Sequence, residues 1–196
     1  MKVGLFGANG RMGRVLVEAL DLSDDAQLSV ATVRDDSPWV GLNVGELAGI
    51  GKKDVDCTAL SDLSGNDADV MIDFTLPSVI ESNLTWCVKN KMPVVIGTTG
   101  LNDSQLAALD EAAKHIPIVF AANYSVGVNL MLSLVRQAAS VLGETADIEI
   151  TEAHHRFKQD APSGTAMAIG EAIADELGRD LKTCAVYGRE GKEPER

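Results

Sequence analysis

The 196-residue sequence has few cysteines, few aromatic residues and few positive charges. Its three cysteines lie far apart and form no Cys-x-x-Cys pair, which excludes a disulfide framework and a zinc site and is typical of a reducing compartment. Lys and Arg total 17 against 29 Asp and Glu, so the formal net charge is −12. This acidic balance, with only eight aromatic residues, argues against a broad nucleic-acid surface or a base-stacking platform. We predict no metal and no nucleic-acid partner.

Long hydrophobic runs are also missing. The apolar run at residues 116–122 is far too short to span a bilayer. Gly7 interrupts the first apolar run at once, so no targeting signal is expected there. Apolar residues make up 45% of the chain and charged residues 23%, as in globular proteins that bury a core without disulfides. We therefore expect a cytoplasmic protein with no membrane partner.

The first two-thirds of the sequence alternate short β-branched runs with segments of helical periodicity. Strands are predicted at residues 3–6, 28–33, 70–74, 94–96 and 118–121, and helices at residues 11–20, 78–90 and 103–115. This alternation predicts βαβ units around a parallel sheet, and the nearly continuous apolar strands indicate a sheet covered on both faces. The segment at residues 34–53 has weak periodicity and is predicted to be a mobile loop.

The pattern changes after Tyr124. A long helix is predicted to residue 142, and residues 163–177 form a second helix. Residues 147–153 alternate apolar and polar side chains, as in a half-solvated strand, and residues 181–187 are predicted to form another strand.

The predicted fold class is α/β. A Rossmann-type dinucleotide-binding domain occupies residues 1–125, and an α+β substrate-binding and catalytic domain with a mixed sheet occupies residues 126–196. Two helices and two strands leave an exposed sheet edge, so this second domain is predicted to be incomplete.

A glycine-rich loop connects the first predicted strand to the first predicted helix. It reads Gly7-Ala8-Asn9-Gly10-Arg11-Met12-Gly13, with G-x-x-G-x-x-G spacing. Glycines allow the backbone to approach a phosphate closely, and the helix that follows offers free N–H groups and the positive end of its dipole. A plain glycine turn is the alternative. The position at the first strand–helix junction favours binding of a dinucleotide such as NADPH or NADH.

The residues after the second predicted strand bear on the choice of cofactor. The dinucleotide pattern predicts an acidic residue about 20 positions after the glycines, to hold the adenine ribose. The strand instead ends at Val33-Arg34-Asp35-Asp36. The guanidinium of Arg34 matches a ribose 2′-phosphate, which favours NADPH over NADH. Asp35 is still able to bind a ribose hydroxyl, and a solvated pair of loop charges is the alternative interpretation.

Two further segments follow predicted strands, where ligands of open α/β sheets gather. Gly97-Thr98-Thr99-Gly100 follows the strand at residues 94–96, and its hydroxyls suit a nicotinamide ribose or amide. A helix N-cap and turn would also explain these residue types. Ala121-Ala122-Asn123-Tyr124 ends the next strand and faces the same crevice, unless it is only a loop that joins two domains.

The third motif runs from Glu152 to Ala166. It gathers His154, His155, Arg156 and Lys158 in an otherwise acidic chain, which predicts a local site for an anionic substrate. Ser163-Gly164-Thr165 begins a helix, whose free N–H groups suit a carboxylate. A His or Lys near a reacting carbon can supply a proton. A capped helix after a basic surface loop is the alternative.

These motifs resemble one known family. Residues 149–166 read Glu-Ile-x-Glu-x-His-x-x-x-Lys-x-Asp-x-Pro-Ser-Gly-Thr-Ala, which is similar to the signature of 4-hydroxy-tetrahydrodipicolinate reductase, also called dihydrodipicolinate reductase. The glycine loop, the turn at residues 97–100 and residues 121–129 are similar to that family as well. The resemblance implies hydride transfer from NADH or NADPH to a cyclic imine derived from aspartate semialdehyde and pyruvate. The product would be tetrahydrodipicolinate, in lysine and diaminopimelate biosynthesis.

The resemblance also implies residue roles and an assembly. His154 would donate and accept the proton, and Lys158 would be a second proton donor. The carboxylates of a small dicarboxylate substrate would be held by His155, Ser163, Gly164 and Thr165. The cofactor would contact Gly7, Ala8, Asn9, Gly10, Arg11, Met12, Arg34, Gly97, Thr98, Thr99, Ala121, Ala122, Asn123 and Tyr124. Full-length members would form homotetramers through the substrate-domain sheets.

Two departures from the family leave other functions open. Val33 stands where many members carry the ribose-binding acid, and members continue well past Arg196, which predicts a truncated and inactive fragment as one alternative. A dinucleotide-sensing module without turnover is another. A reductase for an open-chain aldehyde or a sugar is a third. The cluster at residues 154–165 favours the reductase, because a pure sensor does not need it.

Overall fold

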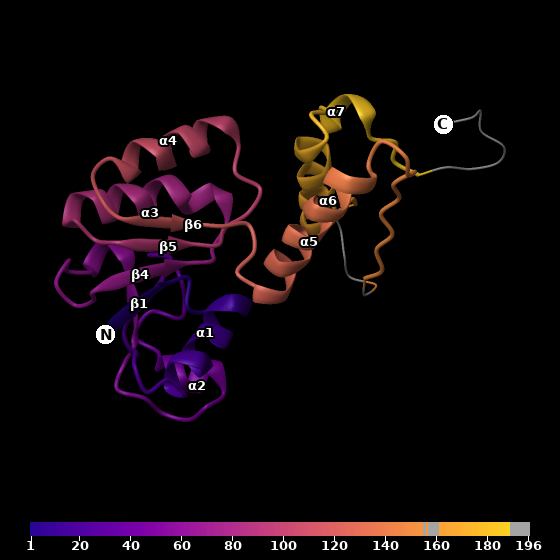
Figure 1. The fold of residues 1–196 in the computed structure, drawn as a ribbon. Helices are drawn as coiled ribbons and strands as arrows, with labels where there is room; N and C mark the ends of the chain where they lie inside the picture. Colours follow the sequence, from indigo (N-terminus) through magenta and orange to yellow (C-terminus); the bar gives the residue numbers. More distant parts are fainter. Residues whose placement is uncertain (155, 157–160, 189–196) are drawn as a thin grey trace. The chain divides into compact units, whose positions relative to one another are not determined.

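The computed structural model describes residues 1–154, 156 and 161–188 (Figure 1). The chain divides into two compact units, Met1–Ala122 and Asn123–Arg196. Two of the predicted site residues, His155 and Lys158, lie outside the described residues.

The first unit is built on a six-stranded parallel sheet. Its strands are β1 (Lys2–Phe6), β2 (Gln27–Val33), β3 (Cys57–Ala59), β4 (Val70–Asp73), β5 (Val94–Ile96) and β6 (Ile118–Phe120). They lie in the order β3-β2-β1-β4-β5-β6. The chain therefore reverses its direction of travel across the sheet between β1 and β4, which is where open α/β sheets bind their ligands. The predicted Rossmann-type fold is confirmed for this unit.

Helices cover both faces of this sheet. They are α1 (Arg11–Asp21), α2 (Val44–Ala48), α3 (Pro77–Asn90) and α4 (Asp103–Ala113), with a short 3-10 helix at Leu60–Asp62. Side chains of β1 alternate between two cores: Leu5 packs with α1 and α2, and Phe6 packs with α3 and α4. Figure 1 shows α3 and α4 side by side along the sheet. Burial on both faces explains why the strands read as continuous apolar runs.

The segment after β2 differs from the predicted loop. It contains α2, which is capped by the side chain of Asn43 and ends at Gly49 in the left-handed conformation, with φ 82°. The Asn43 amide also donates to the carbonyls of Lys53 and Val55, which closes the segment on itself. The prediction missed α2 and β3 because elements of five and three residues are too short to show a periodicity.

The second unit contains α5 (Val126–Leu142), α6 (Gly164–Glu176) and α7 (Leu181–Cys184). The two long helices were predicted, and they pack against each other. Both predicted strands are wrong. Residues 147–153 carry no strand, because the part of this unit that the structure describes offers no strand to pair with. The segment at residues 181–187 begins with α7 instead, because the Asp180 side chain accepts the N–H of Lys182 and caps a helical turn.

Candidate active site

The register of the sheet lines up the segments predicted to contact a cofactor. It pairs Phe6 with Asp73, Asp73 with Ile96, and Ile96 with Phe120. The segments that follow, at residues 7–13, 97–99 and 121–122, therefore begin in one row at the carboxyl edge of the sheet. Asn123 and Tyr124 belong to the second unit.

The glycine loop is shaped by close contacts within the backbone. Gly7 has φ 67°, which is left-handed, and its carbonyl accepts the N–H of Gly10 at 2.9 Å. A Cβ on Gly13 would lie 2.4 Å from the Gly7 carbonyl oxygen and 2.7 Å from the Ala8 Cα, so only glycine fits there. Arg11 and Met12 are exposed on the first turn of α1. The three glycines thus allow the helix to begin directly at the loop, as the sequence predicted.

The N-terminus of α1 has no capping side chain. Its N-cap residue is Gly10, and its first turn carries no acidic residue. By contrast, Asn102, Ser125 and Ser163 cap α4, α5 and α6 with their side chains. The first N–H groups of a helix have no carbonyl partner inside it, so α1 presents backbone donors that suit an anionic group.

The end of β2 places Arg34 in solvent. The Arg34 and Asp36 side chains are 78% and 79% exposed, and their charged atoms are 3.6 Å apart. An exposed pair of this kind contributes little to stability, so the Arg34 guanidinium can exchange Asp36 for another anion. Asp35 accepts the backbone N–H of Ser61 at 3.3 Å. Val33 itself is buried in the core.

Asp73, which the sequence analysis did not single out, holds the turn after β5 in place. Thr98 is 2% exposed, and its hydroxyl donates to the buried carboxylate of Asp73 at 3.0 Å. Gly97 is required because a Cβ there would lie 2.2 Å from the Phe74 ring. Thr99 is exposed. The available signal was an acidic residue within the apolar run VMIDF, since a buried Asp is rare without a local purpose.

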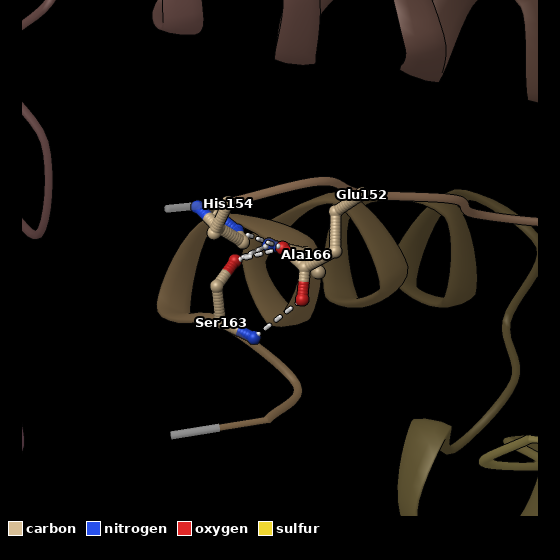
Figure 2. A network of polar contacts seen from close by, with 4 residues as sticks. All are labelled: Glu152, His154, Ser163 and Ala166. Atoms are coloured by element: carbon tan, nitrogen blue, oxygen red, sulfur yellow. Dashed lines mark hydrogen bonds and ion pairs between the residues drawn. The ribbon is translucent and has the colours of Figure 1, made fainter. Parts of the chain in front are cut away.

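The third motif forms a bonded cluster in the second unit (Figure 2). The Glu152 carboxylate accepts the backbone N–H of Ser163 at 2.8 Å and also the Ser163 hydroxyl. The same carboxylate lies 2.8 Å from Nε2 of His154. Ser163 in turn caps α6 by accepting the N–H of Ala166 at 3.0 Å. Gly164 and Thr165 are the first two residues of α6, so their N–H groups have no carbonyl partner within the helix.

The electrostatics of this cluster centre on Glu152. Hydrogen bonds from the Ser163 hydroxyl, His154 and the Ser163 N–H lower the pKa of Glu152 from its usual 4.5 to about 2. Glu152 is therefore ionised at neutral pH. An ionised carboxylate only accepts hydrogen bonds, so the facing Nε2 of His154 carries a proton, and Nδ1 is the basic nitrogen of the neutral ring.

Two other features concern ligands and membranes. Within residues 1–154, 156 and 161–188, no group of three or more His, Cys, Asp or Glu side chains is arranged to hold a metal ion. None of the helices in those ranges is long and apolar enough to cross a membrane.

Comparison with known proteins shows which family has this arrangement. Residues 1–124 match the family described as "Dihydrodipicolinate reductase, N-terminus", and residues 127–195 match "Dihydrodipicolinate reductase, C-terminus". A 4-hydroxy-tetrahydrodipicolinate reductase from Pseudoalteromonas atlantica is 64% identical over 195 residues, which cover 100% of this chain and 73% of that protein. One from Acinetobacter baumannii is 54% identical over 190 residues, covering 97% of this chain and 69% of that protein.

A solved structure agrees with these matches. The dipicolinate-bound dihydrodipicolinate reductase from Paenisporosarcina sp. TG-14 has a TM-score of 0.72 and 26% identity to this chain. The match covers 99% of this chain and 71% of that one. The resemblance read from the sequence motifs is confirmed.

Proposed function

The chain belongs to the dihydrodipicolinate reductase family, and we propose that it reduces 4-hydroxy-tetrahydrodipicolinate to tetrahydrodipicolinate with NADH or NADPH, in lysine and diaminopimelate biosynthesis. The observation that carries this proposal is the bonded cluster of Glu152, His154 and Ser163 at the start of α6. A protein that only senses a dinucleotide has no need of a histidine held beside a helix N-terminus.

Residues 1–125 bind the dinucleotide in this proposal. The glycine loop fits a pyrophosphate, because Gly7 and Gly13 leave no room for a side chain and α1 has no cap of its own. The bound cofactor supplies a hydride. Thr99 and the backbone at Gly97 and Thr98 bind its nicotinamide end, since the buried Thr98 hydroxyl already donates to Asp73. Ala121 to Tyr124 complete the contacts. Arg34 binds the 2′-phosphate of NADPH, which its exposure allows.

Residues 126–196 bind the substrate. The Paenisporosarcina enzyme is named as binding dipicolinate, an aromatic dicarboxylate, which supports a cyclic dicarboxylate as the substrate class here. The N–H groups of Gly164 and Thr165 receive one carboxylate at the positive end of the α6 dipole. Ser163 is the N-cap residue beside these two N–H groups, and its own N–H and hydroxyl donate to Glu152. His155 binds the substrate from the segment that precedes α6.

His154 holds the proton that neutralises the charge left after hydride transfer. Glu152 orients the ring through Nε2, so the transferred proton resides on Nδ1 when His154 is charged. Lys158 is a second proton donor in this proposal. The homotetramer and the cytoplasmic location stay predictions, to be tested by light scattering and fractionation.

Loss of reduced-nicotinamide absorbance with freshly generated 4-hydroxy-tetrahydrodipicolinate tests the proposal. Parallel assays with NADH and NADPH report the cofactor preference, and faster turnover with NADPH is expected. An open-chain aldehyde in place of the cyclic substrate is the control and should give no turnover. Binding of cofactor and of dipicolinate without turnover would contradict a reductase activity of this chain.

A further inference from the structure

A carboxylate lies buried beneath the predicted cofactor edge of the first unit. Asp73 is the last residue of β4 and is 0% exposed. The register places it between Phe6, just before the glycine loop, and Ile96, just before the turn at residues 97–99. Burying a charge is unfavourable unless its oxygens are hydrogen-bonded, so an acid at this position requires partners.

Four donors satisfy this carboxylate. Its Oδ1 accepts the Thr75 N–H at 2.9 Å, the Thr75 hydroxyl at 2.6 Å and the Thr98 hydroxyl at 3.0 Å. Its Oδ2 accepts the side-chain amide of Asn83, on α3, at 2.8 Å. Each of the four bonds runs from a donor on a partner residue to a carboxylate oxygen of Asp73. One side chain thereby joins the chain after β4, the turn after β5 and a covering helix.

These bonds fix the two loops that the cofactor is proposed to contact. The bond from the Thr75 hydroxyl sets the rotamer of that side chain, and its methyl carbon then lies against the glycine loop: a Cβ on Gly7 would be 2.8 Å from it. The Thr98 hydroxyl has one hydrogen, and its bond to Asp73 directs that hydrogen into the interior of the first unit. A core that needed only packing would carry an apolar residue here, because an apolar side chain needs no partners.

We propose that Asp73 is a positioning residue for the nicotinamide cofactor, which sets the spacing between the glycine loop and the turn at residues 97–99 through Thr75 and Thr98. This inference rests on the dinucleotide site of the proposed function. Asp73 acts on the part of the site that NADH and NADPH share. Replacing Asp73 should therefore lower the affinities for NADH and NADPH by the same factor, whereas replacing Arg34 should lower only the affinity for NADPH.

The decisive variants exchange two partners. Asp73→Asn keeps the shape, but one acceptor oxygen becomes an NH₂ group, which faces either the Thr75 N–H or the side-chain NH₂ of Asn83, donor against donor. Adding Asn83→Asp restores a donor–acceptor pair at the same place. Titration of the 196-residue chain with NADH and NADPH, followed by nicotinamide fluorescence, measures both dissociation constants directly. We expect Asp73→Asn to raise both by about 10-fold or more, and the double variant to return them to within about threefold of wild type.

Ile80→Val separates positioning from general destabilisation. Ile80 is fully buried on α3 and belongs to the same core, so this change lowers the melting temperature without touching the Asp73 bonds. It should leave both dissociation constants unchanged. If Asp73→Asn does not fold, Thr75→Val is the substitute, because it removes one hydroxyl and keeps the methyl group. It is expected to raise the dissociation constants of both NADH and NADPH.

The outcomes are distinct. Wild-type affinities in Asp73→Asn, or an equal loss in Ile80→Val, would overturn the positioning role while leaving the proposed function standing. A wild-type chain that binds neither nucleotide would overturn the proposed function and this inference with it.

Discussion

Ser163 donates both its backbone N–H and its hydroxyl to the carboxylate of Glu152, and the same hydroxyl accepts the N–H of Ala166. Ser163 is therefore both the N-cap of α6 and the anchor of the segment that carries His154. The carboxylate of Glu152 also lies at the positive end of the α6 dipole, which favours its charge. The stability of α6 and the position of His154 thus depend on one serine.

Replacing that serine should destabilise the chain more than replacing an ordinary cap. Ser163→Ala removes the cap and the bond to Glu152, and we expect a loss of about 2 kcal/mol in the free energy of unfolding. Ser125→Ala is the matched control, because Ser125 caps α5 with a single bond of 3.4 Å to Val128. Its expected loss is about 0.5 kcal/mol. Urea unfolding measures both, and equal losses would contradict the double role of Ser163.

The same cluster should make stability depend on acid pH. The pKa of Glu152 is lowered to about 2 in the folded chain, from the usual 4.5 of an unfolded one. Ionised Glu152 therefore stabilises the fold fully above pH 4.5, and that contribution disappears as the pH falls toward 2. The difference in urea midpoint between wild type and Glu152→Gln should shrink across this range. Ser163→Ala removes the hydroxyl bond and keeps those from His154 and the backbone N–H, so in that background the difference should be smaller and should shrink less as the pH falls. A difference that stays constant with pH in the wild-type background would contradict the stabilising role of ionised Glu152.

The fold of the first unit was predictable because its strands carry continuous apolar runs, and central β1 is buried on both faces. β4 and β5 appear in the sequence as VMID and VVI. The strand predicted at residues 147–153 failed for the opposite reason. Alternation of apolar and polar residues indicates only which face of a segment is buried. A strand also needs a neighbouring strand to bond with, and no local sequence pattern shows whether one is present.

The candidate site was predictable where its residues are consecutive. The glycine loop and the motif from Glu152 to Thr165 were recognised because the residues of each lie close together in the sequence. Asp73 was missed because two of its three partner residues are distant in the sequence: Asn83 lies 10 residues away on α3 and Thr98 lies 25 residues away after β5. The pairing of Glu152 with Ser163 was missed as well, since a motif gives residue types and does not give their hydrogen bonds.

A methyl group on the third glycine of the loop should disrupt the cofactor site. The Cβ of Gly13→Ala would collide with backbone atoms of Gly7 and Ala8, which cannot rotate away. We expect a loss of more than about 2 kcal/mol in unfolding free energy and of NADPH binding. Gly127→Ala is the control, because its Cβ would meet only the Ser125 hydroxyl oxygen at 3.8 Å. Alanine favours a helix, so this variant should gain up to about 1 kcal/mol. Wild-type affinity in Gly13→Ala would refute the close-packed loop.

Arg34 should decide the choice between the two nucleotides. Arg34→Ala removes the guanidinium proposed to bind the 2′-phosphate, so the dissociation constant of NADPH should rise by about 10-fold or more. That of NADH should not change. Asp36→Asn removes only the exposed carboxylate beside Arg34 and should keep or improve NADPH binding. Fluorescence titration of the three chains measures these constants, and an equal loss for NADH and NADPH would show that Arg34 does not contact the 2′-phosphate.

His154 should affect turnover and leave cofactor binding intact. Its ring is held by Glu152 in the second unit, whereas the glycine loop belongs to the first, so His154→Ala removes the proton carrier without disturbing the dinucleotide loop. A positioned acid or base contributes about 100-fold or more to a proton transfer, and we expect kcat to fall by that factor. His115→Ala is the control, because that side chain is 57% exposed just after α4 and pairs only with Glu111 in the described contacts. Steady-state kinetics and nucleotide titration on the same preparations give both quantities. Because proton delivery follows binding, a parallel loss of kcat and of NADPH affinity would exclude His154 as the proton carrier.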